Sequence, residues 1–227
     1  MKQKTDKHLA YFDVKEALVG SASCAFCTIE TKSLERYFDS LLYELANDPR
    51  VRADLLRSCG YCNRHTRFLL NSRKALSTTV LYRNNVKAFI EYLDGLLSHA
   101  SCRIPQKGKE EWNMHRACPA CRIQRDVQDR IISVFLENME DPDMRTALES
   151  SAGFCVPHFF AVMEKAGKPS ARMMICRVQR EKVAGLATEL DEFIQKQDYR
   201  FSREPLDKEG NSWFRAVRMI AGDNGLF

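Results

Sequence analysis

The residues best suited to chemistry in this sequence are three thiols and one imidazole that occur twice, each time as a C-x2-C pair followed by a C-x2-H pair. The two sets are Cys24, Cys27, Cys62 and His65, and then Cys118, Cys121, Cys155 and His158. Three sulfurs and one nitrogen in a tetrahedral array form a common structural zinc site, with no open position for water. The motifs therefore predict two closed metal sites.

The spacing within each motif suits a single cation. Two intervening residues let a C-x2-C pair turn tightly around one ion. Cys62 and His65 stand three residues apart at a predicted helix start, so both side chains lie on one helix face. The helix N-terminus also favours a thiolate. Taken in chain order, each C-x2-H pair completes the C-x2-C pair before it, which predicts one site within 24–65 and another within 118–158.

Zinc, with two ions per chain, is the leading prediction for the metal. Such sites contribute on the order of 10 kcal/mol or more to the folding of small zinc modules. Sulfur ligands also hold iron–sulfur clusters, so an iron–sulfur redox protein is the alternative. A redox dithiol role for the C-x2-C pairs is disfavoured, because that role usually accompanies a βαβ pattern, which is absent here.

Three further cysteines lie outside the ligand sets. Cys59 forms a second C-x2-C pair with Cys62, but Ala152 stands at the corresponding place in the second set. This comparison assigns Cys62 as the ligand and Cys59 as a packed bystander. A lone cysteine is most often a small core residue, which is our interpretation of Cys102 and Cys176.

Helices must position these ligands. Apolar residues recur at three- and four-residue steps after Cys27, after Cys121 and again over 81–97, which is the pattern of amphipathic helices. Asp48-Pro49 and Asp141-Pro142 each predict a helix start with an aspartate cap and a proline in the first turn. No sustained period-two alternation is present, so we predict an all-α fold.

The order of motifs indicates an internal duplication. The pattern of residues 60–65 recurs at 153–158. The apolar stripe of the last helix of the first repeat recurs ninety-seven positions later, and we assign the residues of both stripes to the core. The paired positions are Val86, Phe89, Leu93, Leu96 and Leu97 with Val183, Leu186, Leu190, Phe193 and Ile194. The predicted architecture is two homologous metal-stapled helical repeats packed together, 1–100 (core 24–97) and 118–197, joined by a linker over 101–117.

The remaining residues, 198–227, have no counterpart in the first repeat. Trp213, Val217 and Ile220 lie at helical spacing, which predicts a tail helix that packs back on the second repeat. At the other end, a short lead-in helix is expected around 13–18, before Gly20.

Composition indicates a cytoplasmic protein. Apolar residues make up 44% and charged residues 29% of the chain, as in soluble globular proteins. No apolar run approaches the roughly 20 residues of a membrane-spanning helix, and no apolar segment follows the charged start, so we expect neither a signal peptide nor a membrane partner. Nine cysteines, most of them in metal-type motifs, suit a reducing compartment.

A basic segment, 50–87, suggests an anionic partner such as nucleic acid. Its bases are Arg50, Arg52, Arg57, Arg64, Arg67, Arg73, Lys74, Arg83 and Lys87, against Asp54 as the one acid. The opposing interpretation is a solvated face balanced by acids of the preceding helix, and it is favoured because no known nucleic-acid fold is visible. No catalytic motif is visible either, which favours a non-enzymatic scaffold that binds a protein or an anionic partner.

A resemblance to a known family rests on the ligand motifs, on Leu41–Pro49 and on the tail residues Asp198–Phe201 and Ser212-Trp213. The chain resembles an uncharacterised bacterial family of helical proteins with duplicated C-x2-C and C-x2-H motifs, a domain of unknown function. The resemblance spans nearly the whole chain. It implies the helical fold and the ligand sets, and it brings no activity or substrate. The chain departs from the family pattern in carrying Cys59.

Overall fold

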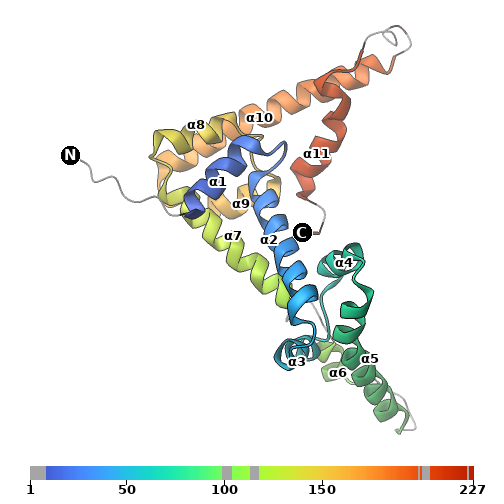
Figure 1. Ribbon diagram of the computed structural model, residues 1–227. Coiled ribbons are helices and arrows are strands. Elements are labelled where there is room, and N and C mark those ends of the chain that lie inside the picture. The colour runs from blue at the N-terminus through green and yellow to red at the C-terminus, as the bar shows by residue number, and fades with distance from the viewer. Residues whose placement is uncertain (1–8, 99–103, 113–117, 199, 201–204, 224) are drawn as a thin grey trace, which may run out of the picture. The chain divides into compact units, whose positions relative to one another are not determined.

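All regular structure in the part of the chain described here is helical, and no strand occurs in it (Figure 1). The structure is a computed structural model that describes residues 9–98, 104–112, 118–198, 200, 205–223 and 225–227. The predicted all-α fold is confirmed. Among these residues, no helix combines the length and the apolar character needed to cross a membrane.

The helices follow the predicted order. In the described residues they are α1 Leu9–Gly20, α2 Ala25–Ser40, α3 Pro49–Arg57, α4 Asn63–Ser72, α5 Ala75–Leu97, α6 Gln106–Glu111, α7 Pro119–Glu137, α8 Pro142–Ser150, α9 Val156–Lys165, α10 Pro169–Lys196 and α11 Ser212–Ala221. A π-helical turn, Leu41–Leu45, continues α2, and a 3-10 turn, Lys208–Asn211, precedes α11. The series α2–α5 and the series α7–α10 present the same motifs in the same order. Their common origin stays a prediction.

The two Asp-Pro helix starts form as predicted. The side chain of Asp48 caps α3 by accepting the N–H two residues ahead at 2.8 Å, and Asp141 caps α8 in the same way at 3.1 Å. Gly60 and Gly153 adopt positive φ angles of 102° and 80°, which lets the chain turn just before each C-x2-H pair. Residues 106–111 form α6 within the segment that the sequence indicated as a linker.

The chain divides into two compact units that differ from the predicted repeats. Unit 1 comprises residues 1–31 and 128–227, and unit 2 comprises residues 32–127. The divisions fall inside α2 and α7, so each unit takes the start of one of these helices and the end of the other. Each unit therefore combines parts of both predicted repeats.

The core of unit 1 is built on three phenylalanines. Phe26 at the start of α2 contacts Phe135 near the end of α7, with ring centroids 5.7 Å apart, and Phe154 lies 4.9 and 5.4 Å from the two. All three side chains are fully buried. The Tyr11 hydroxyl donates to Asp141 at 2.7 Å and fastens α1 to the start of α8. The start of α2 therefore lies beside the end of α7 within unit 1.

The core of unit 2 is centred on Tyr61, which contacts the end of α2. Its ring lies 5.0 Å from that of Phe38, and its hydroxyl is 2.7 Å from the hydroxyl of Tyr37. The Tyr61 N–H donates to the Tyr82 hydroxyl on α5 at 3.2 Å. In unit 1, the N–H of Phe154 donates to Gln179 on α10 at 2.9 Å. The long helix of each unit thus holds the backbone just ahead of the C-x2-H pair.

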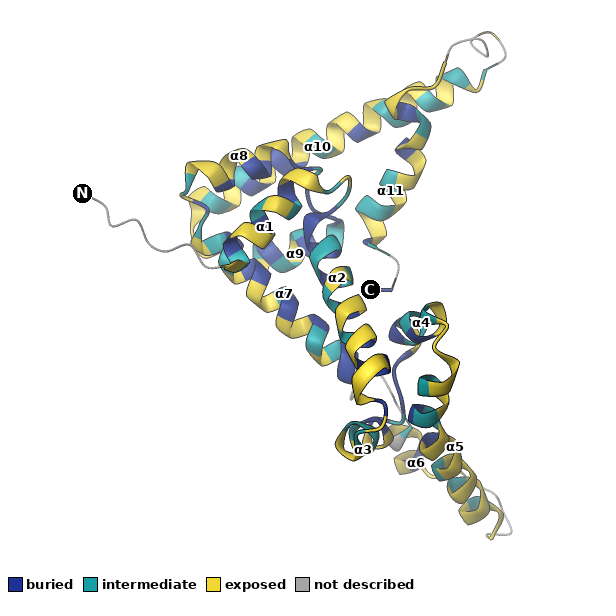
Figure 2. Ribbon diagram, viewed as in Figure 1, coloured by how far each residue is buried: buried dark blue, intermediate teal, exposed yellow. Residues whose placement is uncertain are grey.

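Several residues predicted for the core are exposed instead. On α5, Val86, Phe89, Leu93 and Leu97 are exposed, and Leu81 is buried. Much of the α5 ribbon has the colour of exposed residues (Figure 2). On α10, the prediction holds for Leu186, which is buried, and fails for Val183 and Ile194, which are exposed. A helical spacing of apolar residues defines a face of the helix, but it does not say whether the same chain covers that face.

The tail helix forms as predicted but packs with a different face. α11 contacts α10 and α9. Trp213, Val217 and Ile220, the stripe that predicted the helix, are exposed. The contacts to α10 come from the other side, where Arg215 pairs with Glu189.

Candidate metal centres

The eight predicted ligands gather into two groups of four, but the motifs pair across the two repeats. Site 1 comprises Cys24, Cys27, Cys155 and His158, and site 2 comprises Cys62, His65, Cys118 and Cys121. The prediction that each C-x2-C pair shares a site with the C-x2-H pair following it is wrong. Site 1 lies wholly within unit 1, and site 2 wholly within unit 2.

The length of α2 explains the crossed pairing. Tyr61, the residue before Cys62, packs against Tyr37 and Phe38. These positions lie ten or more residues beyond Cys27 on the same helix, and ten residues of α-helix rise about 15 Å. The next C-x2-H pair along the chain is therefore fixed at the wrong end of α2 to complete a site with Cys27.

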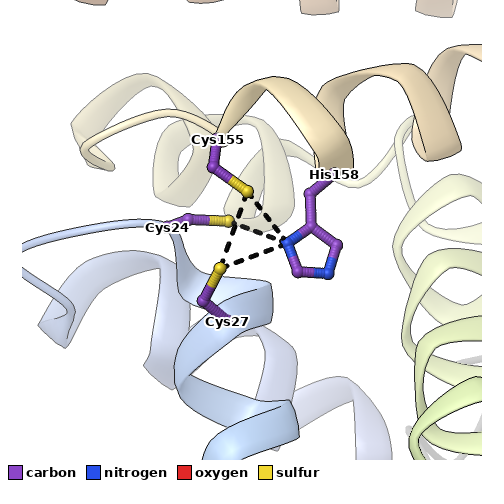
Figure 3. A group of neighbouring side chains, drawn as sticks. All are labelled: Cys24, Cys27, Cys155 and His158. Carbon is purple, nitrogen blue, oxygen red and sulfur yellow. Dashed lines mark hydrogen bonds between the residues drawn. The ribbon is translucent and has the colours of Figure 1, made fainter. Parts of the chain in front are cut away.

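Site 1 has the dimensions of a tetrahedron around one ion (Figure 3). The Sγ atoms of Cys27 and Cys155 lie 3.6 Å apart. His158 Nδ1 lies 3.4, 3.3 and 3.2 Å from the sulfurs of Cys24, Cys27 and Cys155. A tetrahedral zinc ion with Zn–S of about 2.3 Å and Zn–N of about 2.0 Å implies sulfur–sulfur edges of about 3.8 Å and sulfur–nitrogen edges of about 3.5 Å. The ligand set of site 1 therefore fits a single zinc ion.

Site 2 repeats this arrangement. The Sγ atoms of Cys62 and Cys121 are 3.7 Å apart. His65 Nδ1 lies 3.3 Å from Cys62, 3.6 Å from Cys118 and 3.4 Å from Cys121. In both sites the ligand nitrogen is Nδ1, and in both the four ligand atoms all lie within 4.8 Å of one another.

A second partner orients each imidazole. His158 Nε2 lies 2.7 Å from the Glu30 carboxylate, and His65 Nε2 lies 3.1 Å from the Gln124 side-chain oxygen. With Nδ1 facing the metal position, Nε2 carries the hydrogen and donates it to these oxygens, as is usual for metal-bound histidines. Glu30 and Gln124 were not predicted. The signal was present, because each stands three residues after the second cysteine of its C-x2-C pair, on the same helix face.

The electrostatics of site 1 call for a cation. Burial opposes ionisation of Cys24, but hydrogen bonds from Cys155 and Cys27 hold the pKa of Cys24 well below its ordinary value. The pKa of Cys27 is raised, because hydrogen bonds with Cys155 and Cys24 favour its protonated form. Burial lowers the pKa of His158, but the two thiols and Glu30 outweigh it and raise that pKa to about 12. Without a metal, the positive charge beside the Cys24 thiolate is that of the protonated His158 ring; a divalent ion would supply that charge in its place and favour the thiolate forms of all three cysteines.

Site 2 has a different charge balance. Burial and the nearby Arg64 guanidinium lower the pKa of His65 to about 4, which keeps the ring in the neutral form that binds metals. Burial and the charges of Cys118 and Cys62 raise the pKa of Cys121 to about 12. Arg64 also donates to Cys121 Sγ at 3.7 Å, and Cys121 is partly exposed. Site 2 therefore has a cation beside one sulfur, whereas site 1 has the carboxylate of Glu30.

Residues after α11 cover site 1. The chain turns at Gly222, with φ 78° and ψ −176°, and Leu226 is buried. The Phe227 ring lies edge-on to the His158 ring at 5.1 Å between centroids. A Cβ atom at residue 222 would lie 2.5 Å from the Phe227 ring and 3.5 Å from Cys155 Sγ. The tail thus packs over part of site 1, a position that the sequence did not suggest.

The other cysteines lie outside both groups of ligands. Cys59, which is partly exposed and has a φ of 53°, belongs to neither group. Cys176 is exposed, so its assignment to the core is wrong. Cys102 lies outside the described residues.

Part of the basic segment 50–87 is engaged within unit 2. Arg50 pairs with Asp48 at 3.5 Å, Arg57 pairs with Asp54, and Arg64 donates to a ligand sulfur. These contacts reduce the charge available to an anionic partner. Nucleic-acid binding by this segment stays a prediction.

Comparison with known proteins confirms the resemblance to an uncharacterised family. A model of a family of unknown function, DUF6062, matches residues 1–225. An uncharacterised 23.9 kDa protein encoded in the xynA 3′ region of Caldicellulosiruptor sp. (strain Rt8B.4) is 26% identical over 203 residues, covering 88% of this chain and 95% of that protein. No solved structure matches the chain.

Proposed function

The chain belongs to the DUF6062 family of unknown function, and we propose that it is a zinc protein whose two Cys3His sites are structural. Each zinc ion holds together one compact unit of a non-enzymatic scaffold that binds another macromolecule. The observation that carries this proposal is the spacing of the ligand atoms, which corresponds in both sites to the corners of a tetrahedron around one ion.

The same spacing favours a single ion over an iron–sulfur cluster. The four ligands of a cluster are shared among two or more iron atoms with sulfide between them, so at least some of them lie farther apart than the ligands of one ion. In each site here all four ligand atoms lie within 4.8 Å of one another, which supports a single ion. Among single ions, zinc suits three thiolates and one imidazole in tetrahedral geometry.

A structural role follows from the completeness and burial of each ligand set. Four protein ligands fill a tetrahedron, so no position is left for a water or a substrate. In site 1 every ligand is buried, and in site 2 only Cys121 is partly exposed. Each site also joins separated segments, since Cys27 and Cys155 stand 128 positions apart in the chain. Metal binding therefore contributes to folding, on the order of 10 kcal/mol per site in small zinc modules.

Metal analysis of anaerobically purified protein tests the proposal. We expect about two zinc ions per chain and no visible absorbance. Iron with acid-labile sulfide, together with a broad band near about 400 nm, would instead support an iron–sulfur redox protein. Removal of zinc by a chelator should lower the helical signal in circular dichroism, and zinc addition should restore it. A metal-free chain that keeps its full fold contradicts the structural role.

A further inference from the structure

Helix α5 carries an apolar seam on a face that its own unit leaves exposed. The seam comprises Val86, Ile90, Leu93 and Leu97, which follow one another at steps of four, three and four residues. This is the spacing of the a and d positions of a coiled coil. Their exposed fractions are 58, 52, 40 and 71%. A single exposed leucine is ordinary, but four large apolar side chains in register on one helix face indicate a docking surface.

Other residues of α5 supply its contacts within unit 2. Leu81 and Asn85 are buried on the opposite side of the helix, and the Asn85 amide donates to the Leu55 carbonyl at 3.1 Å. Tyr82, one turn before Val86, accepts from the Tyr61 N–H, and Trp112 packs edge-on against Phe89 with 4.7 Å between ring centroids. The four seam side chains remain exposed beside these contacts.

We propose that a second copy of this chain docks on the seam, with the two α5 helices antiparallel. A twofold axis between Ile90 and Leu93 pairs Ile90 with the partner's Leu93 and Val86 with the partner's Leu97. The twofold axis repeats each of these two pairs once, so the interface contains four side-chain pairs, all of them apolar. The surface is self-complementary, as a closed twofold interface requires.

Charged residues around the seam support the antiparallel orientation. Arg83 occupies the a position before Val86, and a parallel pair in register would place it against the same residue of the partner. The antiparallel arrangement separates these two arginines. Lys87 and Asp94 are exposed at equivalent flanking positions, and the twofold axis brings each Lys87 near the partner's Asp94. Opposite charges therefore meet twice across the interface.

The area of the seam suits a reversible dimer. The seam and its flanking side chains would remove on the order of 1,000 Å² from water over both copies, which is the lower limit for a specific interface. Removing a single seam side chain should then have a large effect on association.

Helix α10 offers an internal comparison. Its corresponding positions carry Val183, Ala187, Leu190 and Ile194. Ala187 is small where α5 has Ile90, and Leu190 is only partly exposed. Ala184 stands in place of Lys87, so the charge pair is lost as well. α10 therefore lacks a complete seam, and its exposed residues serve as matched controls.

Sedimentation velocity of the full, zinc-loaded chain between roughly 1 and 100 μM tests the proposal. We expect a concentration-dependent dimer. Val86→Glu should leave the chain monomeric over this range, with its zinc content and helical signal unchanged. Val183→Glu, the same substitution at the corresponding exposed valine, should leave the dimer intact. A chain that is monomeric at every concentration, or a dimer that Val86→Glu does not weaken, overturns the proposal.

Charge reversal tests the orientation in the same assay. Lys87→Asp alone and Asp94→Lys alone should each weaken the dimer several-fold, because each places like charges together twice. The double variant Lys87→Asp/Asp94→Lys should restore the original affinity. A double variant no tighter than the single variants shows that the antiparallel register is wrong.

Discussion

The sulfur atoms of Cys27 and Cys155 lie 3.6 Å apart, although the two residues stand 128 positions apart in the chain. Cys62 and Cys121 form the corresponding contact in site 2 at 3.7 Å, across 59 residues. A metal ion in either site therefore closes a long loop. Restricting a long loop removes much of the conformational freedom of the unfolded chain, which is one way in which such an ion stabilises the folded state.

Paired cysteine substitutions distinguish the crossed pairing from the pairing expected in chain order. Cys27→Ala/Cys155→Ala damages site 1 twice and should leave about one zinc per chain. Cys27→Ala/Cys62→Ala removes the same number of thiols but damages both sites, and should leave almost none. Mass spectrometry of the bound metal gives the count. The opposite ranking of the two double variants would falsify the crossed assignment.

The partners of the imidazoles should control metal affinity. Glu30→Ala should weaken zinc binding at site 1 by about 10- to 100-fold, because His158 loses the acceptor that orients it. Gln124→Ala should act in the same way at site 2. Competition with a coloured chelator measures both affinities. Glu35→Ala is the control, since Glu35 is an exposed acid on the same helix as Glu30; an equal effect from Glu35→Ala would show that Glu30 has no specific role.

The tail should slow metal exchange at site 1. In Gly222→Ala the new Cβ meets the Phe227 ring, and the backbone angles at 222 suit glycine almost alone, at a cost of about 1–3 kcal/mol. We expect a lower free energy of unfolding in urea and faster replacement of the site 1 zinc by cadmium. Gly167→Ala is the control, because no atom lies within 4 Å of a Cβ at that position. Unchanged exchange in Gly222→Ala would mean that the tail does not protect the site.

The two sites should release zinc at different rates. Site 2 should lose its ion first to a chelator, because Cys121 is partly exposed while every ligand of site 1 is buried. Two kinetic phases are therefore expected. The fast phase should disappear in Cys118→Ala/Cys121→Ala, and the slow phase in Cys24→Ala/Cys27→Ala. Disappearance of the slow phase in the first of these variants would reverse the assignment.

Cys59 should be dispensable for metal binding. Cys59→Ala should keep about two zinc ions per chain, whereas Cys62→Ala should keep about one. Because residue 59 has a φ of 53°, Cys59→Gly should also relieve backbone strain and raise the free energy of unfolding by about 1 kcal/mol. Metal analysis and urea unfolding measure the two effects. A loss of zinc in Cys59→Ala would make Cys59 a ligand.

Local features of this protein could be read from its sequence because they depend on neighbouring residues. Asp48 and Asp141 each cap a helix by accepting the N–H of the residue two positions ahead. Gly60 adopts a positive φ, which glycine does without steric cost. The ligand types follow the same logic, since C-x2-C and C-x2-H spacing places two donors on one side of a turn or helix. The eight residues that gather into two groups of four and the all-α fold could therefore be predicted from the sequence.

The pairing of the motifs and the exposure of the helix faces were decided by tertiary structure. Cys27 and Tyr37 belong to one helix, ten residues apart. Tyr61, next to the C-x2-H pair that follows, packs against Tyr37, whereas Cys27 contacts Cys155. The number of residues from Cys27 to Cys62 does not show that the two cysteines lie in different sites. The same holds for Val86, because a helical period marks an apolar face without naming what covers it. Sequence periodicity records local geometry, whereas contacts across the fold depend on where each helix ends.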